Sequence, residues 1–232
     1  MDESSGRSLD RLGAAAGLAS VLLFVGIIAF MPAIPPPNHT IAAIARKATD
    51  DQAGILRALY LGALLTGALL VFGSSFAARL RRAEGAGGGW WLVALAGIAG
   101  TTVSLSTDML FVTFVRAVGH GVSGNALWVS YPSGPDGVII AIPLAVFLLG
   151  AGFGARASGI LPRWLGWLAT VLAVAFAVGA AGITGDEVDG GILGGFLLLG
   201  YAGLLVWTVA TSVCLWREPR KARAGSREVA TA

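Results

Sequence analysis

The chain has 232 residues, of which 56% are hydrophobic and 12% are charged, and its formal net charge is +3. Soluble domains carry about 25% charged residues, so this composition excludes a charge-covered globular protein and favours one solvated by a lipid bilayer. The small net charge argues against nucleic-acid binding, although the pI is near 9.5. The single cysteine, Cys214, excludes a disulfide within the chain.

The first apolar segment, at 12–31, predicts a transmembrane helix behind a polar cytoplasmic segment at 1–11. It is long enough to cross about 30 Å of hydrocarbon as a helix. Gly13 and Gly17 give it a small-residue face that lets another helix approach closely. Prolines from Pro32 onward end this helix. Residues 40–52 then have the apolar spacing of an amphipathic helix lying on the outer surface.

Five more apolar segments predict five more transmembrane helices. They cover residues 55–76, 90–115, 138–155, 164–183 and 192–216, and a basic cytoplasmic tail follows at 217–232. The pair Trp90-Trp91 is typical of a helix that begins at the membrane interface. The sequence therefore predicts an all-α, polytopic membrane protein, built as a bundle of six transmembrane helices.

The distribution of basic residues predicts the orientation of this bundle. The two termini and the turns after the second and fourth predicted helices carry twelve Arg and Lys, whereas the opposite loops and helix ends carry four. By the positive-inside rule, both termini are predicted to be cytoplasmic. Arginine greatly outnumbers lysine, and Ala, Gly and Val are frequent, which favours a bacterial protein of the cytoplasmic (inner) membrane.

Three short stretches resemble sequences of uncharacterised actinobacterial integral membrane proteins. They are Leu-Pro-Arg-Trp-Leu-Gly-Trp-Leu at 161–168, Ile-Pro-Leu-Ala-Val-Phe-Leu at 142–148 and Ala-Thr-Ser-Val at 210–213. Those proteins carry only domain-of-unknown-function labels. The resemblance implies six helices and supplies no activity.

Asp108 is the strongest candidate for a functional residue. It lies in the apolar segment 90–115, and a carboxylate within a membrane costs several kcal/mol unless it is paired or wetted. Arg57, in the first turn of the second predicted helix, is the expected partner because it lies at a similar depth. Arg116 lies on the same predicted helix as Asp108, but further along it and in a different direction around the helix axis. The pair is either a structural clamp between two helices or a site for a proton, a cation or a polar ligand group.

Other polar residues extend this candidate ligand-binding cluster. Thr101 and Ser104 share a helix face with Asp108, and their hydroxyls either line an aqueous path or bond to carbonyls of their own helix or a neighbouring helix. The outer loop adds further candidates, which form either an outward-facing polar pocket or an ordinary solvated loop. They are His120, Asn125, Trp128 and Tyr131.

No pattern in the sequence indicates catalysis. The two histidines lack metal-ligand spacing. The sequence has no HExxH, G-x-S-x-G or Walker motif and no G-x-G-x-x-G motif after a predicted strand, so we expect no metal and no cofactor. The favoured function is that of an accessory, scaffold or regulatory membrane protein. The alternatives are a small-solute or ion transporter or ligand-binding protein and, less favoured, an intramembrane enzyme. Expected partners are the lipid bilayer, another membrane protein or a second copy, and anionic lipid at the basic tail.

Overall fold

The computed structural model of the protein describes residues 3–30, 46, 49–106, 136–181 and 192–217, and this part of the chain is helical. The elements in chain order are α1 (Glu3–Phe30), α3 (Gln52–Glu84), the short 3-10 helix η1 (Gly85–Gly87), α4 (Trp90–Ser106), α7 (Asp136–Ser158), α8 (Arg163–Ala180) and α9 (Ile192–Trp216). The prediction of an all-α protein is therefore confirmed.

Five of these helices, α1, α3, α7, α8 and α9, are long and apolar enough to cross a membrane. The described part of α4 is also apolar but has 17 residues. Its predicted continuation to residue 115 lies outside the described residues, and so does most of the amphipathic helix predicted at 40–52. By length and composition, these helices are consistent with the membrane protein predicted from the sequence.

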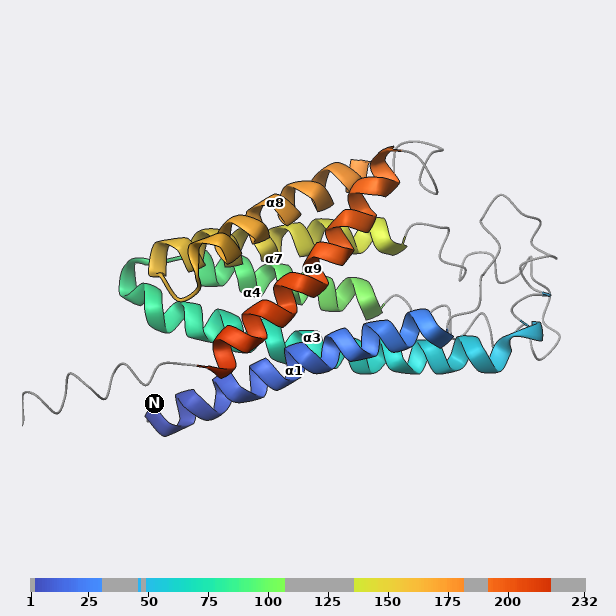
Figure 1. The fold of residues 1–232 in the computed structure, drawn as a ribbon, viewed down its shortest axis with the longest axis horizontal. Coiled ribbons are helices and arrows are strands. Elements are labelled where there is room, and N and C mark those ends of the chain that lie inside the picture. The colour runs from blue at the N-terminus through green and yellow to red at the C-terminus, as the bar shows by residue number, and fades with distance from the viewer. Residues whose placement is uncertain (1–2, 31–45, 47–48, 107–135, 182–191, 218–232) are drawn as a thin grey trace, which may run out of the picture.

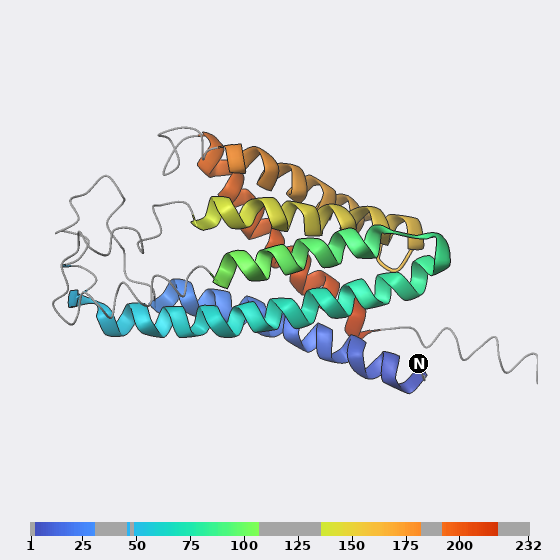
Figure 2. The ribbon, with the colours of Figure 1, turned by 180° about the vertical axis from the view of Figure 1, so that it is seen from behind.

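The helices form a ring in which each one packs against the next along the chain, and α9 closes the ring by packing against α1 (Figures 1 and 2). Successive helices are antiparallel, and α7 also contacts α3 across the ring. Helices α1, α4 and α8 begin, and helices α3, α7 and α9 end, at the same end of the bundle. We call it the basic end, because most of the described arginines lie there. They are Arg7, Arg11, Arg79, Arg81, Arg82, Arg156, Arg163 and Arg217.

Two helices extend beyond their predicted bounds at the basic end. We expected a helix from residue 12, but α1 begins at Glu3. The helix continues through the polar residues before Leu12 because they include no proline and because Asp10 has partners on α3. α3 continues past residue 76 to Glu84 and ends at Gly85, whose φ of 68° is readily adopted by glycine. Polar residues thus prolong both helices past the end of the apolar sequence.

Four aromatic side chains fill the centre of the ring. Trp207 of α9 packs edge-to-face against Phe72 and Phe76 of α3 and Phe147 of α7, with ring centroids 5.8–6.1 Å apart. All four rings are buried. The indole Nε1 of Trp207 donates a hydrogen bond of 3.1 Å to the backbone oxygen of Leu165 on α8. This aromatic cluster therefore connects three helices by ring contacts and a fourth by a hydrogen bond.

We expect Trp207→Phe to lower the free energy of unfolding by about 1–3 kcal/mol, because it removes the indole hydrogen bond and leaves a cavity in a packed core. The measurement is SDS-induced unfolding of the purified protein followed by circular dichroism. Trp164→Phe is the matched control, since the Trp164 ring is exposed. Equal stability losses in the two variants would contradict a special role for the central tryptophan.

Candidate functional site

The structure describes three of the residues of the predicted polar cluster. Arg57, Thr101 and Ser104 lie on described helices, whereas six others fall within 107–135, outside the described residues. These six are Asp108, Arg116, His120, Asn125, Trp128 and Tyr131. The Arg57–Asp108 pair and the outer-loop pocket therefore stay predictions.

Arg57 lies in the second turn of α3, at the end of the bundle opposite the basic end. Its side chain is exposed, and with Phe30, Leu56, Tyr60 and Leu61 it lines an open and mainly apolar depression between α1 and α3. The guanidinium is the charged group in an otherwise apolar and aromatic lining. This position is compatible with a carboxylate partner at the same end of the bundle.

Thr101 and Ser104 bond to their own helix. The Thr101 hydroxyl donates to the Gly97 carbonyl at 2.9 Å, and the Ser104 hydroxyl donates to the Gly100 carbonyl at 3.0 Å. Thr101 is only 1% exposed. This arrangement corresponds to the backbone-bonded alternative rather than to a wetted polar face, since a hydroxyl that bonds four residues back is satisfied without water.

The face of α4 that carries Thr101 packs tightly against α7. A Cβ atom added at Gly97 would lie 2.2 Å from the backbone nitrogen of Phe147, and one added at Gly100 would lie 2.9 Å from Cβ of Pro143. The helices thus approach through small residues, as membrane helices commonly do. Little space remains between the two backbones next to Thr101.

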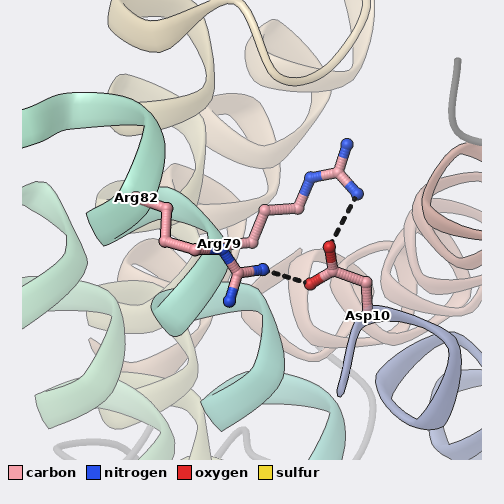
Figure 3. A network of polar contacts seen from close by, with 3 residues as sticks. All are labelled: Asp10, Arg79 and Arg82. Carbon is pink, nitrogen blue, oxygen red and sulfur yellow. Dashed lines mark hydrogen bonds and ion pairs between the residues drawn. The ribbon is translucent and has the colours of Figure 1, made fainter. Parts of the chain in front are cut away.

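A buried ionic cluster at the basic end was missed by the sequence analysis (Figure 3). Asp10 of α1 accepts a hydrogen bond of 2.5 Å from Nη2 of Arg82, and its other oxygen lies 3.5 Å from Nη1 of Arg79. The side chains of Asp10 and Arg79 are 9% and 11% exposed, and that of Arg82 is 35% exposed. One carboxylate therefore joins α1 to two arginines on successive turns of α3.

The sequence does contain a signal for this cluster. Asp10, Gly13 and Gly17 lie on one face of α1, and the contacts of this face run antiparallel along α3. A Cβ at Gly13 would meet Ser75, and a Cβ at Gly17 would meet Phe72 and Ser212 of α9. The small-residue face that we predicted is thus confirmed, and extending it by one turn toward the N-terminus leads to Asp10.

A second carboxylate at the basic end closes the hairpin between α3 and α4. The Glu84 carboxylate accepts a hydrogen bond of 3.1 Å from the backbone N–H of Trp90, the first residue of α4. This bond satisfies one of the donors that a helix N-terminus leaves unpaired. Glu84 and Asp10 both tie helices together, so their positions indicate structural roles.

The described residues contain no group of three His, Cys, Asp or Glu side chains that could hold a metal ion. The comparisons found no protein-family model that matches the chain, and no significant match among curated proteins or solved structures. The resemblance of residues 161–168 to actinobacterial membrane proteins accordingly stays a prediction.

Proposed function

We propose that this chain is an accessory or scaffold protein of a bacterial cytoplasmic membrane, which it crosses six times with both termini in the cytoplasm. The observation that carries the proposal is the filled centre of the helix ring. Trp207 and the three phenylalanines around it occupy the position that a solute path through a ring of helices would take. Tight packing of α4 on α7 around Thr101 supports the same interpretation.

The charged residues at the basic end support the proposed orientation. Asp10, Arg79 and Arg82 fix α1 to α3 where the apolar parts of both helices end. The basic end contains eight of the described arginines, whereas the opposite end contains Arg46 and Arg57. Under the positive-inside rule, this asymmetry supports the proposal that the basic end faces the cytoplasm.

The accessibility of residue 101 distinguishes a scaffold from a transporter. In a Cys214→Ser background, we expect a single cysteine at Thr101 to resist a membrane-impermeant maleimide added to intact cells, because the position is buried between two helices. A cysteine at Ala53, which is exposed at the start of α3, is the positive control. Strong labelling at position 101 would contradict the proposal and favour a transporter or ligand-binding protein.

Photo-crosslinking tests whether the bundle has a protein partner. Photoreactive residues are placed at Leu22 on α1, Val174 on α8 and Leu198 on α9, whose side chains are all exposed. We expect one face to give a discrete adduct with a second copy or another membrane protein, while the other faces react with lipid. Lipid adducts at all three positions would contradict a scaffold role.

A further inference from the structure

Arg156, in the last turn of α7, is held between two aromatic rings at the basic end. Its guanidinium carbon lies 4.4 Å from the centroid of the Phe153 ring and 4.2 Å from the centroid of the Trp167 ring on α8. Trp90 of α4 also stacks on Phe153, with a centroid distance of 4.9 Å and an interplanar angle of 17°. Three helices thus contribute to one stack, which fixes the plane of the guanidinium.

Close packing of α7 on α8 sets the position of this arginine. A Cβ atom added at Gly166 would lie 2.6 Å from Cγ of Arg156, so the aliphatic part of the side chain crosses α8 where a glycine leaves room. The Nε atom donates a hydrogen bond of 3.2 Å to the backbone oxygen of Gly152. The side chain is therefore ordered before any ligand binds, which lowers the entropic cost of binding.

The outer edge of the guanidinium is available to a ligand. Within the part of the chain that the structure describes, Arg156 has no acidic partner, and its two Nη groups make no hydrogen bond. The flanking rings of Phe153 and Trp167 are 39% and 59% exposed. Two parallel N–H donors beside exposed aromatic surface match a ligand that carries a phosphate next to an apolar group.

We propose that Arg156 binds the phosphate of an anionic phospholipid in the leaflet that contacts the basic end. The two Nη groups hold two phosphate oxygens, and the rings of Trp167 and Phe153 contact the glycerol and the upper acyl chain. Tryptophan is enriched at this depth in membranes, and the surrounding arginines favour a lipid with net negative charge over a zwitterionic lipid. This site is separate from the basic tail and does not depend on the scaffold proposal.

The test measures lipid binding to the delipidated full-length protein in detergent by native mass spectrometry. Phosphatidylglycerol, phosphatidylcholine and inorganic phosphate are the probes. We expect one phosphatidylglycerol to bind more tightly than phosphatidylcholine, and its affinity to fall about 10-fold in Arg156→Gln through loss of two charge-assisted hydrogen bonds. Arg156→Lys keeps the charge and the aliphatic stem but not the planar fork, so we expect it to lose affinity as well.

Arg163→Gln is the matched control, because it removes an exposed arginine from the same end and from the helix that carries Trp167. We expect it to change the affinity less than about 2-fold, since it removes only diffuse attraction. Equal losses in Arg156→Gln and Arg163→Gln would overturn the proposal. So would equal binding of both lipids, or displacement of phosphatidylglycerol by millimolar inorganic phosphate. Thermal unfolding of each variant shows whether it is folded. If Arg156→Gln is not folded, the lipid affinity of Arg156→Lys decides the test.

Discussion

Replacing Gly97 by alanine is expected to lower the free energy of unfolding by about 2 kcal/mol or more, the upper range for overpacking a well-packed core. The added Cβ atom would lie 2.2 Å from the backbone nitrogen of Phe147 and 2.5 Å from its Cα. Backbone atoms cannot rotate away as a flexible side chain can, so α4 and α7 must separate. Gly150→Ala should have a similar effect, since its Cβ would meet the backbone of Ala94 at 2.4 Å.

Gly67→Ala is the control for this prediction. Gly67 lies within α3, and a Cβ added there meets no atom of the described residues within 4 Å. Alanine is the better helix former by about 1 kcal/mol, so this variant should unfold at the same or a higher SDS concentration than the wild type. If Gly97→Ala also left the stability unchanged, the close approach of α4 to α7 would be wrong.

The second large effect is expected from Asp10→Asn. It removes the negative charge shared by Arg79 and Arg82, and removing one member of a buried ion pair costs about 3–5 kcal/mol. Arg82 is partly exposed and solvent screens its share, so we expect a loss of about 2 kcal/mol. The measurement is SDS unfolding followed by circular dichroism, compared with Arg11→Gln.

Arg11 is an exposed neighbour of Asp10, and its loss should change the stability by less than about 0.5 kcal/mol. A double mutant, Asp10→Asn with Arg79→Gln, should lose less stability than the sum of its single mutants, because the second change no longer breaks an intact pair. Additive losses would contradict the ionic cluster as a coupled unit.

The helical fold could be predicted from the sequence because an apolar run of about 20 residues has few alternatives in a bilayer. The segments at 138–155, 164–183 and 192–216 each contain or largely overlap a helix of the structure. The small-residue faces could also be predicted, since Gly13 and Gly17 repeat at a helical spacing. At the basic end, α1 and α3 extend past the predicted apolar segments. Hydropathy marks only the apolar part of a helix, and both helices continue through polar sequence beyond that part.

The ionic cluster could not be predicted from hydropathy for the same reason. Asp10 lies in what we expected to be a polar terminal segment, and Arg79 and Arg82 lie in what we expected to be a turn. Only when both stretches are helical do these three side chains meet. The aromatic cluster around Trp207 has a different cause, since it depends on which faces of three separate helices turn toward the centre. Both the buried and the exposed positions of these helices carry apolar residues, so the sequence does not reveal which faces turn toward the centre.

The charged residues of α3 also define a length. Between Arg57 and Arg79 the helix contains the 21 residues 58–78 without a charge, which span about 32 Å at 1.5 Å per residue. One boundary of this interval is fixed by the pairing of Arg79 with Asp10. The interval matches the hydrocarbon thickness of an ordinary bilayer, about 30 Å, so the bundle should fit such a membrane without mismatch. In a thicker, sterol-rich membrane, the lipid around α3 would have to thin, and the protein should partition toward thinner regions.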